Sequence, residues 1–200
     1  MLKDLELSND DFKDIYDYCA FKKIEFLSTA FDSSSLSFLS NTLNINKFKI
    51  PSGELSNAPF ILEHALLGKN LIVSTGMSTL KDIEIALGVI AFGLKNSKDK
   101  PSLKKFSEAY NSKSGKNMLR KNVTLLHCTT SYPAPIDEVN LKAMISLKER
   151  FKINVGFSDH TKGILAPIVA SSLGANIIEK HFTLDKNQKG PDHKASIEPE

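Results

Sequence analysis

The sequence has few of the features that mark secreted, membrane-bound or nucleic-acid-binding proteins. It contains two cysteines, Cys19 and Cys128, and no tryptophan. Two cysteines are too few for a disulfide framework, so we expect reduced thiols in a cytoplasmic protein. No apolar run reaches the roughly 18 residues of a membrane helix, and we expect no signal peptide. The net charge of +3 is small, and the lysines are dispersed except between Lys95 and Lys121. We therefore expect neither a membrane nor a nucleic acid as a partner.

Short apolar runs alternate with amphipathic stretches along the whole chain. The runs predicted to be strands are 24–31, 47–54, 70–76, 123–128, 153–161 and 176–183. The stretches predicted to be helical are 8–20, 36–43, 60–67, 79–94, 141–151 and 163–173, and Ser8, Asn57 and Ser78 or Thr79 supply capping side chains. In the last stretch, Ile164, Leu165, Ile168, Val169 and Leu173 form the apolar stripe expected of an amphipathic helix. Such regular alternation with short connections predicts a parallel α/β protein.

Both a doubly wound sheet and a (β/α) barrel fit this pattern. A whole barrel typically needs eight strands and about 250 residues. With six strands, a TIM-type barrel built from residues 1–200 would be incomplete, with the first two strands missing. Residues 96–122 are rich in Lys, Ser and Asn, so we interpret them as a polar insertion of low order with a fragment of helix near 103–110.

Two of the predicted strands end in histidine. Parallel neighbours place their carboxyl ends on the same side, so His160 and His181 are expected at one rim of the sheet. Side chains alternate along a strand, which places Ser158 on the same face as His160 and Glu179 on the same face as His181. Two imidazoles at such a rim can hold a divalent metal. A single histidine after a strand is more often only a hydrogen-bonding residue, and we interpret His64 and His127 in that way.

Hydroxyl groups and one lysine recur at the ends of all six predicted strands. The residues concerned are Ser28 and Thr29, Lys49 and Ser52, Ser74 and Thr75, Thr129 to Tyr132, Ser158 and Thr161, and Thr183. Short donors with a positive charge suit a phosphate or carboxylate. For any single Ser or Thr a turn or helix cap is the commoner explanation. The recurrence at six successive strand ends favours anion binding.

Seven motifs, in order, resemble those of the sialic acid synthase family, of the N-acetylneuraminate or legionaminate synthase type. They are Phe26–Phe31, Lys49–Glu54, Ser74–Met77, Leu126–Thr129 with Tyr132-Pro133, Gly156–Thr161, Glu179–Thr183 and Gly190–Ser196. The resemblance covers nearly the whole chain apart from the segment 96–122. It implies a barrel that condenses phosphoenolpyruvate with an N-acylated, ManNAc-like hexosamine to form a nonulosonic acid and release phosphate.

The resemblance also implies roles for individual residues. A divalent metal, Mn²⁺ or Mg²⁺, would be held by His160 and His181 and would polarise the sugar aldehyde. The positions matching the phosphate site are Thr29, Lys49, Ser52 and Ser74, and those matching the carboxylate site are Thr130 and Ser158. Tyr132 and Asp192 match positions that line the sugar site. Glu54 and Glu179 match acids near the reacting atoms, and we count them as catalytic together with the two histidines.

The sequence departs from the family pattern in three respects. Thr130 stands where neuraminate-type relatives often carry asparagine, and the segment 96–122 is inserted. We also expect residues 1–200 to lack the family's first two strands and its carboxyl-terminal antifreeze-like domain. Family members are homodimers in which that domain reaches the partner's site, so we expect a homodimer of the complete protein. The alternative to an active synthase is a truncated, catalytically inert fragment that acts at most as a binding or assembly piece. Another phosphoenolpyruvate-condensing aldolase is less favoured, because we find no second basic cluster for a phosphorylated sugar.

Overall fold

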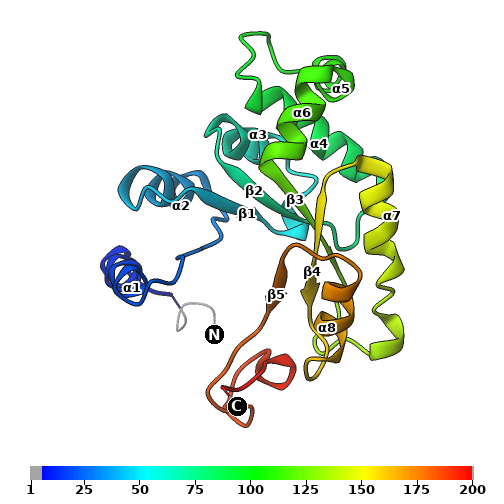
Figure 1. Cartoon of the computed structure of the whole chain (residues 1–200). Helices are drawn as coiled ribbons and strands as arrows, with labels where there is room; N and C mark the ends of the chain where they lie inside the picture. The colour runs from blue at the N-terminus through cyan, green and yellow to red at the C-terminus, as the bar shows by residue number, and fades with distance from the viewer. Residues whose placement is uncertain (1–5, 200) are drawn as a thin grey trace.

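The computed structural model, which describes residues 6–199, contains a parallel sheet of five strands. The strands are β1 (Lys47–Ile50), β2 (Asn70–Ser74), β3 (Val123–Cys128), β4 (Asn154–Asp159) and β5 (Ile178–Lys180). Each strand pairs in parallel with the next strand along the chain, in the order β1-β2-β3-β4-β5 (Figure 1). The sheet curls as part of a barrel wall, with the helices on its outer side. The predicted parallel α/β fold of barrel type is confirmed, with five strands among the described residues in place of the six predicted.

Helices precede or connect the strands, as the alternation predicts. They are α1 (Asn9–Phe21), α2 (Ser33–Ser37) with a π-helical turn at Phe38–Thr42, α3 (Ala58–Leu66), α4 (Leu80–Leu94), α5 (Leu103–Asn111), α6 (Lys113–Asn122), α7 (Lys142–Phe151) and α8 (Leu165–Ser172). Short 3₁₀ turns lie at Ser52–Glu54, Ile136–Glu138 and His193–Ala195. The predicted caps Ser8, Asn57 and Thr79 each accept a backbone N–H at the start of a helix. Within residues 6–199, no helix is both long and apolar enough to cross a bilayer.

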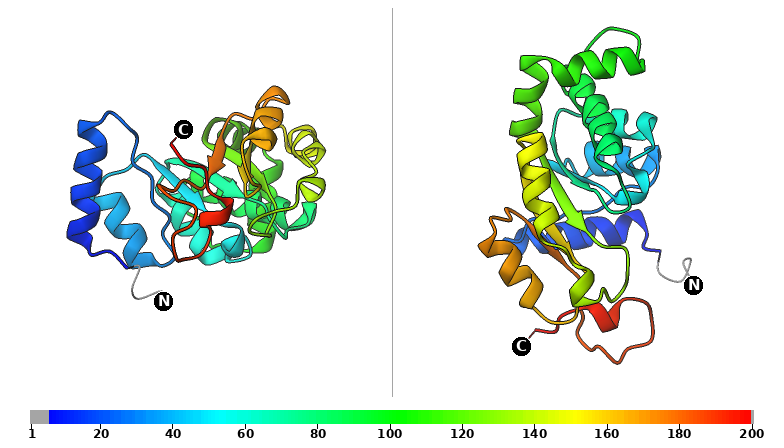
Figure 2. Two further views of the ribbon diagram at one scale, coloured as in Figure 1. Left: turned by 90° about the horizontal axis from the view of Figure 1, so that it is seen from below. Right: turned by 90° about the vertical axis from the view of Figure 1, so that its right-hand side faces the viewer.

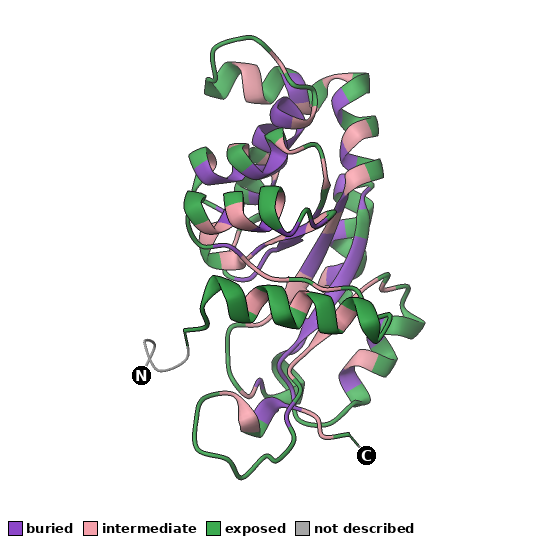
Figure 3. Cartoon of the chain, turned by 90° about the vertical axis from the view of Figure 1, so that its left-hand side faces the viewer, coloured by how far each residue is buried: buried purple, intermediate pink, exposed green. Residues whose placement is uncertain are grey.

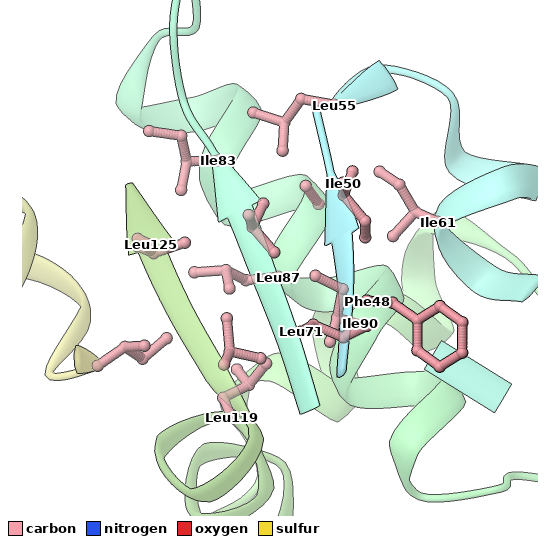
Figure 4. Packing of buried hydrophobic residues seen from close by; sticks show 14 of the residues in the cluster. Phe48, Ile50, Leu55, Ile61, Leu71, Ile83, Leu87, Ile90, Leu119 and Leu125 are labelled. Carbon is pink, nitrogen blue, oxygen red and sulfur yellow. The ribbon is translucent and has the colours of Figure 1, made fainter. Parts of the chain in front are cut away.

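Alternation along the strands separates an outer apolar face from an inner polar one. Phe48 and Ile50 of β1 pair in register with Leu71 and Val73 of β2, and all four side chains are buried. They pack against α4 through residues such as Leu87, as Figure 4 shows. The intervening residues, among them Lys49 and Ser74, therefore project from the opposite, concave face.

The predicted first strand is wrong. Residues 24–30 have no regular secondary structure, and in Figure 1 the chain here runs between α1 and α2. The apolar side chain of Phe26 packs edge-on against Phe12 and Tyr16 of α1, with ring centroids 6.5 and 5.7 Å apart. These contacts satisfy the apolar pattern without a strand partner, so this segment forms no ladder with β1. Figure 2 shows that α1 lies apart from the sheet, and no residue of α1 is fully buried, as its colouring in Figure 3 indicates.

The segment 96–122 is more ordered than its composition suggests. It forms α5 and α6, which both pack on α4. Phe106 contacts Phe92 with ring centroids 5.2 Å apart, and Ala109 and Leu119 are buried. The expectation of low order is wrong because a few apolar residues at helical spacing bind the segment to the core despite its many lysines.

The helix α8 forms where predicted but buries a different face. Ala166 and Ala170 are its buried residues. The stripe that includes Leu165 and Ile168 is exposed, at 64% and 58% for these two side chains. The small alanines permit a close approach to β4, whereas no element within residues 6–199 covers the larger side chains.

Candidate active site

An ion pair between the first and last strands crosses the concave face. Lys49 Nζ on β1 lies 2.6 Å from Glu179 Oε1 on β5. Neighbouring strands are about 4.8 Å apart, so four steps across a flat sheet would separate these strands by roughly 19 Å. The contact therefore depends on the curl of the sheet, which brings residues 130 positions apart in the sequence into one cluster.

Glu179 is the centre of this cluster. Its Oε1 also accepts a hydrogen bond from Ser158 Oγ at 2.6 Å, and Ser158 Oγ lies 3.4 Å from His160 Nε2. Burial opposes ionisation of the carboxyl group, but the Lys49 ammonium and the Ser158 hydroxyl outweigh it and hold the pKa of Glu179 below its usual value. Glu179 is therefore a carboxylate at neutral pH, paired with a cation that a substrate phosphate could also bind.

A backbone carbonyl group fixes the orientation of the His160 ring. It is buried, and its Nδ1 lies 2.9 Å from the carbonyl oxygen of Thr129. A carbonyl can only accept, so Nδ1 carries the proton and Nε2 has a free lone pair. Burial lowers the pKa of the imidazole, which favours this neutral form. Nε2 of His160 can thus act as a base or a metal ligand.

Three rings gather at the carboxyl ends of β4 and β5. The ring centroids of His160 and His181 are 5.7 Å apart, and Tyr132 lies 4.0 Å from the first and 5.8 Å from the second. The rim expected for the two histidines is therefore present. Among the described residues there is no group of three or more His, Cys, Asp or Glu side chains that could hold a metal. Two imidazoles could supply two ligands of a divalent ion, and its other positions would need water or substrate oxygens.

Residues with hydroxyl groups from adjacent strand ends lie around Gly76. A Cβ added to Gly76 would lie 3.2 Å from Thr130 Cγ2 and 3.4 Å from Ser52 Cβ, so these residues surround the glycine. The buried hydroxyl of Ser74 has no hydrogen-bond partner. Because a buried polar group normally finds a partner, Ser74 is a donor available to a ligand.

Thr29 and Glu54 are among the predicted site residues that no described hydrogen bond joins to this cluster. Thr29 lies half-buried in the irregular segment 24–30. Glu54 accepts a hydrogen bond from Asn57 Nδ2 at 2.8 Å, beside the start of α3.

Beside Tyr132 the rim opens into a cleft of about 610 Å³. Asp192 lines this cleft with Tyr132, and Lys162, Lys186 and Lys194 contribute positive charge. Burial raises the pKa of the Tyr132 hydroxyl, with smaller effects from neighbouring Cys128, Asp192 and Glu179. Tyr132 therefore separates the histidine pair from a space large enough for a sugar derivative.

Sequence reasoning missed the groups that support the histidines. The carbonyl of Thr129 orients His160, and no sequence signal could reveal it because every residue has a carbonyl. Lys180 and Asp159 form a buried ion pair on the other side of the same strand ends. Alternation could have indicated this pair, because both residues face away from Ser158 and Glu179.

Comparisons with known proteins agree with the resemblance. The model of the NeuB family matches residues 1–200. An N,N'-diacetyllegionaminic acid synthase of Campylobacter jejuni is 48% identical over 100% of this chain and 53% of its own length. The human N-acetylneuraminate-9-phosphate synthase is 31% identical over 98% of this chain and 47% of its own. The chain thus spans about half the length of these curated relatives.

Solved structures give the same picture of the fold. The N-acetylneuraminic acid synthetase of Leptospira borgpetersenii, crystallised with citrate, superposes with a TM-score of 0.79 at 31% identity, over 97% of this chain and 59% of its own. A truncated 3-deoxy-D-arabino-heptulosonate 7-phosphate synthase of Thermotoga maritima reaches 0.67 at 10% identity over 96% and 67%, which shows likeness of fold alone. With a family model that matches every residue and relatives of this similarity, the chain belongs to the NeuB family of sialic acid synthases.

Proposed function

We propose that the protein containing this chain is a carbon–carbon bond-forming transferase that condenses phosphoenolpyruvate with an N-acylated hexosamine. The product is a nonulosonic acid, and phosphate is released. The names of the relatives support an acid of the sialic or legionaminic type. The observation that carries the proposal is the connected cluster of Lys49, Glu179, Ser158 and His160 on one concave face.

In this proposal the phosphate of phosphoenolpyruvate binds Lys49 and the unpartnered hydroxyl of Ser74, with Ser52 nearby. Ser158 and Thr130 hold its carboxylate. The sugar occupies the cleft beside Tyr132 and Asp192, which directs its open-chain aldehyde toward the two histidines. His160 and His181 would hold Mn²⁺ or Mg²⁺, and the ion would supply a Lewis acid for the aldehyde oxygen.

The reaction then forms one carbon–carbon bond, and it requires a group that accepts a proton from the attacking water. The methylene carbon of phosphoenolpyruvate attacks the aldehyde carbon, and water adds to the cationic carbon that results. Glu179 accepts the proton of this water, because it is ionised and loses its ammonium partner when Lys49 turns to the phosphate. Glu179 then returns this proton to the alkoxide oxygen left by the aldehyde. The tetrahedral intermediate loses phosphate by cleavage of its carbon–oxygen bond, and its hydroxyl proton leaves with the phosphate as the ketone forms.

The test is metal-dependent phosphate release from phosphoenolpyruvate with a panel of N-acylated hexosamines. We expect release only when a divalent metal and an acceptor sugar are both present, and we expect His160→Ala and His181→Ala to abolish it. The full-length Campylobacter legionaminic acid synthase is the positive control. If the complete protein releases no phosphate with any sugar under conditions where this control is active, the proposed function is wrong.

A further inference from the structure

A buried ion pair lies on the outer face of the two strand ends that carry the histidines. Lys180 Nζ is 2.6 Å from Asp159 Oδ2, and their side chains are 8% and 0% exposed. The two residues are direct register partners in the β4–β5 ladder. Asp159 immediately precedes His160, and Lys180 immediately precedes His181. The pair therefore links the two strands one residue before each imidazole.

The same pair closes the turn that follows His160. Asp159 Oδ1 accepts the backbone N–H of Thr161 at 2.9 Å, and the Lys180 ammonium donates to the carbonyl oxygen of Thr161. Lys180 thus contacts the chain on both sides of His160. A side chain of β5 in this way determines the course of the backbone that presents the imidazole of β4.

The backbone alone holds β5 weakly at this point. The strand is three residues long, and its ladder pairs only with β4 and ends at Asp159 and Lys180. His181 lies beyond the ladder, where its carbonyl accepts the N–H of Ile197 at 2.9 Å. A short edge strand can slip or fray, so the separation of the two imidazoles needs a further constraint.

Stability alone does not explain a buried pair of this kind. Desolvation of two charges offsets much of their attraction, and apolar replacements of similar size are often as stable or more stable. We infer that Asp159 and Lys180 are positioning residues that hold His160 and His181 at the separation needed to share one ligand. The catalytic consequence rests on the proposed function, whereas the effect on imidazole geometry does not.

The decisive variant replaces both charges, as Asp159→Leu with Lys180→Met. The double variant also removes the partners of the Thr161 N–H and carbonyl oxygen, so we expect it to fold with a urea midpoint at or somewhat below that of the wild type. We expect its Mn²⁺ affinity, measured from the electron paramagnetic resonance signal of free Mn²⁺, to fall about 10- to 100-fold, the usual effect of removing an outer partner of a metal ligand. The kcat should fall with the affinity, while the KM for phosphoenolpyruvate stays close to that of the wild type.

Two control variants separate positioning from general effects. Arg150→Met removes the exposed ion pair with Glu84 on the far helices and should leave Mn²⁺ affinity unchanged. Leu147→Ala removes a buried side chain of α7 and leaves a cavity in the core. It should lower the urea midpoint without changing the Mn²⁺ affinity.

The outcomes distinguish this inference from the proposed function. A double variant that binds Mn²⁺ as tightly as the wild type overturns the inference, whatever its activity. If the wild type binds Mn²⁺ but releases no phosphate, the proposed function fails and the affinity comparison still decides the inference. If the wild type binds no Mn²⁺, crystal structures of both proteins decide it, and a His160–His181 ring separation that differs by less than about 0.5 Å overturns the inference.

Discussion

Replacement of Lys49 by methionine should raise the pKa of Glu179. The two charged groups are 2.6 Å apart, and their side chains are 18% and 33% exposed. For unit charges centred about 3 Å apart, the attraction is roughly 1.4 kcal/mol at a dielectric constant of about 80 and 3 kcal/mol at about 40. The loss of this attraction should therefore raise the pKa of Glu179. Burial is already the largest single influence and opposes ionisation, and without Lys49 the Ser158 hydroxyl and His160 would be left to oppose it.

The assay is a pH titration of the Glu179 carboxyl carbon by NMR in wild type and variant. Lys47→Met is the matched control, because Lys47 lies two residues earlier on β1 and pairs with the exposed Glu25. This control should leave the pKa of Glu179 unchanged. A pKa in Lys49→Met within about 0.3 units of the wild-type value would refute the electrostatic reasoning, since it would mean that solvent or Ser158 alone keeps the carboxylate ionised.

Two further predictions concern the core. Burial lowers the pKa of His64, whose Nε2 has no hydrogen-bond partner in the structure. The unfolded chain therefore binds the proton more readily, so stability should be full above about pH 6.5 and should fall as pH decreases below it. His64→Leu should remove the share of this pH dependence that His64 contributes, while buried His160 keeps its own share. Urea midpoints measured between pH 5 and 8 test this, and an unchanged slope would contradict it. Gly156→Ala should destabilise the fold by about 1–3 kcal/mol, because its Cβ would lie 2.4 Å from the carbonyl oxygen of Ile177. Gly53→Ala, whose Cβ meets nothing within 4 Å, is the control, and equal urea midpoints for the two variants would contradict this prediction.

The sequence predicted the inner face of the sheet well because strand alternation is strict. Ser158, His160 and Glu179 were expected on one face from their spacing, and the structure brings them into contact. The contact of Glu179 with Lys49 could not be predicted in this way, because it depends on the curl of the whole sheet. The metal, the sugar, the homodimer and the cytoplasmic location stay predictions.

The wrong predictions share a physical cause. An apolar pattern shows which side chains can be buried, but not which element they pack against. Residues 24–31 have the composition of a strand, but Phe26 finds its contacts on α1. The stripe on α8 has the spacing of a buried face, but Ala166 and Ala170 permit the closer approach to β4. In residues 96–122 the opposite happened, since abundant lysines concealed the few apolar contacts, such as Phe106, that order two helices.

At the carboxyl ends of β4 and β5, the inner face of the sheet carries groups that can bind a ligand, and the outer face carries a buried ion pair that fixes the backbone. On the inner face the charged and polar groups have ligand-accessible atoms, such as the Nε2 lone pair of His160 and the ammonium of Lys49. On the outer face Asp159 and Lys180 satisfy each other and are closed to solvent. A charged group that binds a ligand, such as Lys49, must be able to leave its protein partner. A charged group that fixes the backbone, such as Lys180, must keep its partner. The exposure of the two pairs follows this division, with Lys49 at 18% and Lys180 at 8%, and Glu179 at 33% and Asp159 at 0%. Substitution of Lys49 should therefore alter ligand binding and the pKa of Glu179, whereas substitution of Lys180 should alter the geometry of the histidines.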